Sequence, residues 1–178
     1  KYIIDHSENV KIDLDKVKEF AKQIKISESV DWWSMAPYKM DGLNDKDKLT
    51  FVSFLAMQSF CFWGTPKWAV NGHDGVYGFI AAMGRAIEND VPLLDFEYLS
   101  KVSEEEFGEI FKGNVEIPMF KERLEMTQEF GRVMKEKFDG SFEKFLEIKD
   151  IFALQDLLIE SFPLGFKDES LYKDKKVI

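Results

Sequence analysis

The sequence is poor in the residues that usually build metal and redox sites. It has one cysteine, Cys61, and two histidines, His6 and His73, which stand far apart along the chain. One cysteine cannot form an internal disulfide, and no Cys/His or His-Glu-x-x-His spacing is present to assemble a metal site. We therefore expect no metal, no cofactor and a reducing compartment, the cytoplasm.

The sequence also lacks an excess of basic residues and any long apolar run. Its 24 Lys and Arg against 33 Asp and Glu give a net charge of −9. That balance disfavours a nucleic acid duplex and a DNA glycosylase, but one nucleotide needs only a few donors and stays possible as a ligand. No run approaches the roughly 18 apolar residues of a membrane span. We expect neither a duplex nor a membrane as partner, and the oligomeric state stays open.

Aromatic residues are plentiful. The 178 residues are 45% hydrophobic and 15% aromatic, with 17 Phe and 4 Trp, which is enough for one core with several aromatic layers. No repeat or Gly/Ser linker divides the chain, so we expect a single domain over residues 1–178. The last segment, KDESLYKDKKVI, ends on a strand-like apolar pair, and we interpret the chain as the N-terminal part of a larger protein.

Helical periodicity dominates, which predicts an all-α fold: a multi-helix globular body with one short β-hairpin. Asp13 is suited to cap the first amphipathic helix, and Ser103 with Glu106 forms a capping box for a short helix ended by Gly113. The Asn71-Gly72 pair predicts a tight hairpin. Three further helices are expected from Asp74 to before Val91-Pro92, from Pro118 to about Phe138, and from Asp150 to Phe162-Pro163.

A central helix is expected from Leu49 to Trp63, because LTFVSFLAMQSFCFW is apolar nearly all round and fits a helix buried on more than one side. On that helix Phe60 and Trp63 would lie on one side, and Phe62 with Ser59 on another. Rings that face different directions cannot all fill one core. Two alternatives follow, plain core packing or a pocket in which a flat heterocycle stacks.

The hairpin after this segment brings Trp68, His73 and Asp74 beside it, and their polar groups could contact the edge of such a heterocycle. The phenylalanines on either side of Cys61 favour a small buried hydrophobe over a nucleophile.

Other charged residues have simpler interpretations. Arg85 and Arg123 sit in apolar helices, where an internal ion pair is commoner than an anion site. The remaining candidates are acidic residues best explained as the solvated face of the capped helix: Glu104, Glu105, Glu106 and Glu109.

Four segments in succession resemble the queuosine salvage protein family, the queuosine 5′-phosphate N-glycosylase/hydrolases. They are SFCFW, HDGVYGFIAAMGRAIENDVPLLD, IPMFKERLEMTQEFGRVMKEKFDGSF and LLIESFP with a following Lys-Asp, and the resemblance covers residues 10–178. It implies a body similar to helix-hairpin-helix DNA glycosylases. It also implies queuosine salvage, linked to tRNA modification: the hydrolase takes free queuosine 5′-phosphate and releases the 7-deazaguanine base queuine.

The resemblance also implies substrate-binding residues. The family's Asn-Phe-Ser-Phe-Trp segment matches residues 59–63, so Phe60, Phe62 and Trp63 carry over as pocket residues. The family's Gly-Tyr-Trp-Ser segment matches residues 75–78 and leaves Tyr77 as an aromatic substitute in the same wall. The resemblance therefore favours the pocket over plain core packing.

Departures from the family pattern affect the site. Ser59 replaces an amide and Val76 an aromatic residue, and the family's Phe-Pro-x-aromatic-Arg-Asp has an extra residue before Lys167-Asp168. The family's presumed catalytic aspartate lies in an Asp-Tyr-Arg-x-Pro motif that does not occur in this sequence, so no catalytic residue is assigned. A noncatalytic nucleotide-binding or scaffold protein is the alternative function.

Overall fold

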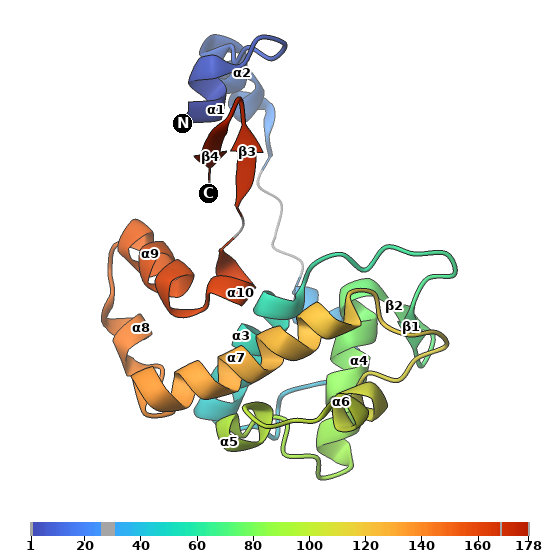
Figure 1. Ribbon diagram of the computed structural model, residues 1–178. Helices are drawn as coiled ribbons and strands as arrows, with labels where there is room; N and C mark the ends of the chain where they lie inside the picture. The colour runs from blue at the N-terminus through green and yellow to red at the C-terminus, as the bar shows by residue number, and fades with distance from the viewer. Residues whose placement is uncertain (1, 26–30, 168, 178) are drawn as a thin grey trace. The chain divides into compact units, whose positions relative to one another are not determined.

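Helices form most of the chain, and the only strands among the described residues are short antiparallel pairs, as the periodicity predicts. The structure is a computed structural model that describes residues 2–25, 31–167 and 169–177 (Figure 1). Two compact units can be distinguished, residues 1–32 with 168–178, and residues 33–167. The all-α prediction is confirmed, whereas one domain over 1–178 and the likeness to helix-hairpin-helix glycosylases stay predictions.

The smaller unit combines two helices with a hairpin: α1 (Tyr2–His6), α2 (Leu14–Gln23), β3 (Ser170–Tyr172) and β4 (Lys175–Val177). Asp13 caps α2 as predicted, since its carboxylate accepts the backbone amides of Asp15 and Lys16, each at 3.1 Å. Of the strand-like apolar pair that ends the sequence, Val177 lies in β4 as predicted, and Ile178 lies outside the described residues. The last segment forms a second hairpin, which the prediction of a single hairpin had missed.

The larger unit is built from three helices of 14 or more residues and several shorter elements. In order, the elements are η1 (Trp32–Met35, which begins at the unit boundary), α3 (Asp45–Gln58), β1 (Ala69–Val70), β2 (His73–Asp74), α4 (Gly75–Glu88), α5 (Phe96–Leu99), α6 (Glu104–Ile110), α7 (Phe120–Phe138), α8 (Glu143–Glu147), α9 (Ile151–Ser161) and α10 (Pro163–Phe166). Helix α7 lies against α3, α5 and α10 (Figure 1). No helix of the described residues is both long and apolar enough to cross a membrane.

Several local predictions are confirmed. Asn71 and Gly72 both have positive φ angles, 51° and 82°, as a type I′ turn between β1 and β2 requires. The Ser103–Glu106 capping box is present, and the acidic face of α6 is exposed. Helix α6 ends at Ile110, because the next residues form the turn that leads to Asn114, so the predicted end at Gly113 is three residues late.

Longer helices also start and stop close to the predicted positions. Helix α7 ends at Phe138 as expected, and α9 begins directly after Asp150, whose side chain accepts two amides of its first turn. Asp74 occupies the position before α4, but its carboxylate accepts no amide of that helix. The carboxylate pairs with Lys67 at 2.9 Å, so the predicted side-chain cap is wrong.

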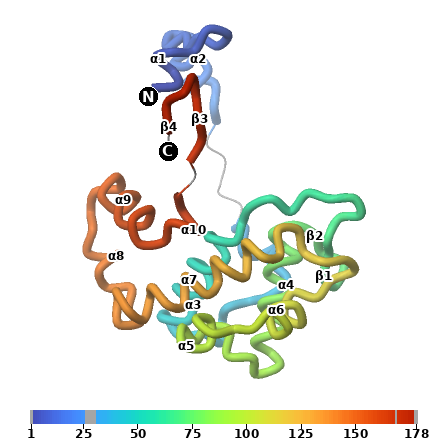
Figure 2. Tube along the Cα trace, in the orientation of Figure 1, coloured from blue at the N-terminus to red at the C-terminus, as the bar shows by residue number. Residues whose placement is uncertain are grey.

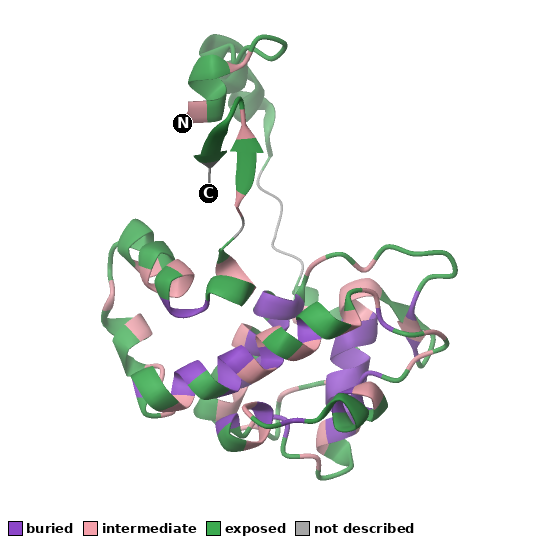
Figure 3. Ribbon diagram, in the orientation of Figure 1, coloured by how far each residue is buried: buried purple, intermediate pink, exposed green. Residues whose placement is uncertain are grey.

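Interlocked phenylalanine rings make up the core, as the aromatic content predicts. Phe79 stacks on Phe111 with ring centroids 4.4 Å apart, and Phe54 lies between Phe79 and Phe130 at 5.9 and 6.1 Å. Trp68 is fully buried beside them, and its indole N–H donates to the Phe111 carbonyl at 3.1 Å. The buried stripes of α4 and α7 show where this core lies (Figure 3). The indole hydrogen bond fixes the residue before the hairpin to the end of α6.

Helix α3 is buried on one broad face only. Its buried residues include Phe51, Phe54 and Gln58, whereas Leu49 and Val52 are exposed. The expectation of burial on more than one side is therefore wrong: α7 and α10 pack against one face, and the apolar residues opposite stay in solvent.

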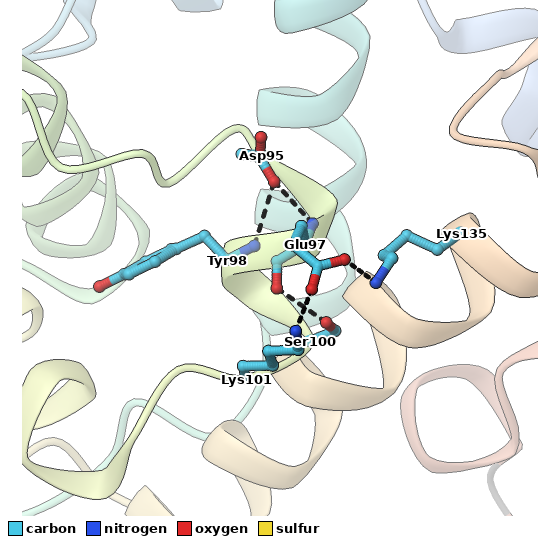
Figure 4. A network of polar contacts seen from close by, with 6 residues as sticks. All are labelled: Asp95, Glu97, Tyr98, Ser100, Lys101 and Lys135. Carbon is cyan, nitrogen blue, oxygen red and sulfur yellow. Dashed lines mark hydrogen bonds and ion pairs between the residues drawn. The ribbon is translucent and has the colours of Figure 1, made fainter.

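Helices α5 and α7 approach each other closely at Gly131. A Cβ atom there would lie 2.6 Å from the Phe96 carbonyl oxygen and 2.7 Å from the Leu99 carbonyl carbon. On the adjacent surface, Lys101 and Lys135 both bind the Glu97 carboxylate (Figure 4). The hydrogen bond from Lys101 has the largest effect and that from Lys135 the next, and they lower the pKa of Glu97 to about 2.

The close approach predicts a strong effect of one methyl group. Gly131→Ala should lower the free energy of unfolding by about 1–3 kcal/mol, because backbone atoms of α5 must move to admit the new carbon. Gly108→Ala in α6 is the matched control: its Cβ would meet nothing closer than the Phe120 ring at 3.8 Å. The control should be neutral or stabilising by up to about 1 kcal/mol. Urea unfolding measures the free energy of unfolding of both variants. Equal destabilisation of the two would contradict the close packing of α5 and α7 at Gly131.

Candidate ligand pocket

The predicted pocket residues lie in an irregular segment that follows α3 (Figure 2). Helix α3 ends at Gln58, five residues before Trp63, so the expected helical faces of Phe60 and Trp63 do not exist. The chain turns sharply here, since Cys61 has a left-handed backbone with φ 42°. The prediction of a helix to Trp63 is wrong because a residue distant in sequence binds the carbonyl groups at this end.

That residue is Arg123 of α7, whose side chain is fully buried. Its Nη1 donates to the Gln58 carbonyl at 2.6 Å, its Nη2 to the Phe60 carbonyl, and its Nε to the Pro118 carbonyl at 2.7 Å. Gln58 returns the contact, since its Nε2 donates to the Arg123 carbonyl at 3.1 Å. A cation at the carbonyl end of α3 also interacts favourably with the helix dipole. Arg123 therefore ends α3 and fixes the segment after it.

Aromatic rings complete the surroundings of this guanidinium group. The Cζ atom of Arg123 lies 4.2 Å from the ring centroid of Phe60 and 4.5 Å from that of Phe62, distances suited to cation–π contact. Burial lowers the pKa of Arg123 to about 10, so the group is still a cation at neutral pH.

An internal ion pair was expected for both Arg123 and the half-buried Arg85, and this expectation is wrong. Like Arg123, Arg85 donates to carbonyl oxygens, those of Ile110 at 2.8 Å and Lys112 at 2.9 Å. Both side chains hold loop backbone in place.

A cavity of about 550 Å³ opens beside the turn, within the size range of small-molecule sites. It is lined by Ser59, Phe60, Cys61, Phe62, Trp63, Gly64, Lys67, Asp74, Gly75 and Val76. The structure thus brings three of the four predicted aromatic residues together. Tyr77, the fourth, lies half-buried in the first turn of α4 and is not among the lining residues.

The three rings differ in what they offer a ligand. Phe62 is half-buried and nearly parallel to Trp68, with centroids 6.0 Å apart and 12° between the planes, so it forms a supported wall. Trp63 is 81% exposed, which leaves its ring available for stacking. Phe60 lies between these extremes, half-buried with Arg123 against its ring.

Polar groups occur along the same cavity. Lys67 and Asp74 form their ion pair at its wall, whereas His73 lies outside the lining and Trp68 is sealed in the core. Cys61 is exposed and lines the cavity, so the expectation of a small buried hydrophobe is wrong. The left-handed turn takes Cys61 out of the helix and its thiol away from the core.

A larger cavity of about 600 Å³ lies between α4 and α6, where it is lined by Arg85, Tyr98, Glu106 and Glu109 among others. Tyr98 is its one aromatic residue, and Arg85 is already bound to two carbonyl groups. The smaller cavity has three rings and a charged pair, which is the combination that a flat polar ligand needs. We therefore take the cavity beside Trp63 as the candidate site.

One buried carboxylate escaped the sequence analysis. Glu129 of α7 is 4% exposed and accepts the backbone amides of Leu164 at 3.0 Å and Gly165 at 3.2 Å, at the start of α10. Burial raises its pKa, a property shared by many catalytic acids. Glu129 does not line the candidate cavity, however, and its partners assign it a structural role. In the sequence, Phe162-Pro163 marks the start of the helix whose amides Glu129 binds, but nothing there identifies Glu129 as the partner.

The structure describes only part of the Lys167-Asp168 pair, which ends the last segment that resembles the family. Asp168, of the Lys167-Asp168 pair, is outside the described residues, and Lys167 is exposed. Ser59, which replaces the family's amide, donates its hydroxyl to the Leu55 carbonyl at 2.6 Å. Its side chain therefore helps to end α3.

Comparison with known proteins extends these observations. A family model described as "Queuosine salvage protein" matches residues 38–178. A Sphaerobacter thermophilus protein named queuosine 5′-phosphate N-glycosylase/hydrolase is 30% identical over 98% of this chain and 55% of its own length. A Mus musculus protein of the same name is 25% identical over 99% of this chain and 56% of its own length. The chain spans about half the length of these curated relatives.

Glu129 gives a pH-dependent prediction. Its folded pKa is raised above the ordinary 4.5, so the folded state binds more protons than the unfolded state between 4.5 and the folded value. Stability from this residue therefore falls as pH rises through that window. Glu129→Gln keeps an oxygen for the α10 amides but removes the titration, so its stability relative to wild type should improve with pH, by about 1.4 kcal/mol per unit of pKa difference.

Urea unfolding between pH 4 and 8 measures this effect. Glu125→Gln, at an exposed position of the same helix, is the control and should run parallel to wild type. A Glu129→Gln curve that also runs parallel would contradict the assignment.

Proposed function

The chain belongs to the queuosine salvage protein family, and on this premise we propose that it takes part in hydrolysis of the N-glycosidic bond of queuosine 5′-phosphate, which releases queuine. The observation that carries the proposal is the cavity with Phe60, Phe62 and Trp63 at the end of α3. The names of the relatives support it, since these describe an N-glycosylase/hydrolase of that nucleotide.

In this proposal the cavity binds the base of the nucleotide. A 7-deazaguanine ring is flat, and the exposed indole of Trp63 offers it a stacking surface beside the supported Phe62 wall. Stacking on an aromatic side chain is typically worth about 1–3 kcal/mol per base. Tyr77 lies in the first turn of α4 and does not line the cavity, so its contribution stays a prediction of the resemblance.

The chemical step needs more than stacking. Cleavage of an N-glycosidic bond passes through an oxocarbenium-like ribose cation, which a carboxylate stabilises or traps, while the leaving base is protonated or hydrogen-bonded. We assign the carboxylate to the family's Asp-Tyr-Arg-x-Pro motif, which does not occur in residues 1–178. Glu129 accepts the amides at the start of α10 and does not line the cavity, so we assign it no role in the reaction.

The proposed setting follows from composition. A net charge of −9 suits a free nucleotide better than a nucleic acid duplex as the partner, and a single exposed cysteine suits the reducing cytoplasm. A second candidate is a noncatalytic protein that binds the nucleotide or its base in the same cavity, because the aromatic rings there need no catalytic group to stack on a flat ligand.

Release of the base tests the proposal. The protein expressed from its natural gene, incubated with queuosine 5′-phosphate, should yield free queuine detectable by mass spectrometry. Trp63→Ala should raise KM about tenfold or more, because the stacking surface is lost. Phe152→Ala is the matched control: Phe152 is also exposed, at 71% against 81%, but lies on α9 outside the cavity, so this variant should behave as wild type.

The outcomes separate the candidates. Binding of the nucleotide without release of queuine would favour the noncatalytic protein. Neither binding nor release would remove both functions.

A further inference from the structure

The ion pair of Lys67 and Asp74 stands at the wall of the cavity that contains the aromatic rings. Lys67 lies in the loop before β1, and Asp74 is the last residue of β2. Nζ of Lys67 is 2.9 Å from Oδ2 of Asp74, and the two side chains are 72% and 54% exposed. An exposed pair of this kind contributes little to stability, typically about 0–1 kcal/mol. A contribution to stability is therefore not enough to account for this ion pair.

Asp74 is set apart from the other aspartates that precede helices. Asp13, Asp95 and Asp150 each accept two backbone amides of the helix that follows. Asp74 occupies the same position before α4, with the extended backbone of a cap (φ −106°, ψ 172°), yet its carboxylate bonds to no amide of α4. The carboxylate faces Lys67 across the cavity wall and stays available to a ligand.

The pair places a hydrogen-bond acceptor beside a donor. The carboxylate of Asp74 has further lone pairs beyond the Oδ2 contact, and the Lys67 ammonium has three donor hydrogens. The lactam edge of a guanine-type base is complementary, because its ring N–H and exocyclic amine are donors and the adjacent ring carbonyl is an acceptor. An adenine-type base reverses this order. Hydrogen bonding to the base edge combined with stacking is a general way to hold an isolated base.

We propose that Lys67 and Asp74 determine specificity for a 7-deazaguanine base. Asp74 accepts hydrogen bonds from the ring N–H and the exocyclic amine, and Lys67 donates one to the ring carbonyl oxygen. This inference rests on the proposed function and names the residues that select the base. A bound base shields the pair from water, which strengthens these charged hydrogen bonds relative to the free protein.

Cys61 supplies a readout of occupancy that does not depend on catalysis. Its exposed thiol lines the cavity, so a bound base should slow its alkylation by iodoacetamide, followed at the Cys61 peptide by mass spectrometry. The probes are 7-deazaguanine and 7-deazaadenine. We expect 7-deazaguanine to protect the wild-type protein at a concentration at least tenfold lower than 7-deazaadenine.

Substitution then identifies the carboxylate responsible. Asp74→Asn should weaken protection by 7-deazaguanine about tenfold or more and leave 7-deazaadenine within about twofold. Loss of a helix cap does not complicate this variant, because Asp74 makes no such bond. Asp15→Asn removes another exposed aspartate paired with a lysine, Lys18, at 3.4 Å in the smaller unit, and should change neither affinity.

The results distinguish this inference from the function on which it rests. Equal protection of Asp74→Asn and wild type by 7-deazaguanine would overturn the role of the pair, while queuine release would leave the function in place. Equal protection of the wild-type protein by 7-deazaguanine and 7-deazaadenine would also overturn the role of the pair and leave the function in place. Failure of both bases to protect Cys61, together with no release of queuine, would overturn both.

Discussion

The arrangement of the candidate site depends on one buried cation. Arg123 is surrounded by carbonyl oxygens and the faces of Phe60 and Phe62, and it is fully buried. A guanidinium group removed from water is costly unless its donors are used, and here they bind Gln58, Phe60 and Pro118. The same hydrogen bonds that stabilise the cation therefore prevent α3 from continuing and hold the next residues in an irregular path.

The cavity follows from that early end of α3. A helix continued to Trp63 would distribute the aromatic side chains around its axis, whereas the turn at Cys61 brings them to the wall of one cavity. Phe62 packs against Trp68 and Phe79 of the core, and Trp63 stays in solvent. A rigid wall beside an available ring is what a flat base requires, and the hairpin contributes the charged pair that can contact the edge of the base.

Features that depend on neighbouring residues could be predicted from the sequence. The Asp13 cap, the Ser103–Glu106 capping box and the Asn71-Gly72 turn each involve groups within a few positions, so residue type and spacing determine them. The end of α3 depends on Arg123, 65 residues away, and the buried position of Glu129 on amides 35 residues away. Neither partner could be identified before the helices were placed in space.

For the site, too, the sequence identified some residues and missed those whose surroundings depend on the folded chain. The resemblance selected Phe60, Phe62 and Trp63, which the structure gathers, but not Lys67, and burial of Cys61 was wrongly inferred from its apolar neighbours.

The affinity of Arg123→Lys for 7-deazaguanine, compared with Arg85→Lys, tests the account most directly. Both substitutions keep a positive charge and shorten a side chain bound to carbonyl groups, but only Arg123 contacts the cavity segment. At a temperature where both are folded, Arg123→Lys should bind the base at least tenfold more weakly than wild type, and Arg85→Lys within about twofold of it. A folded Arg123→Lys protein with wild-type affinity would contradict the claim that this cation forms the pocket.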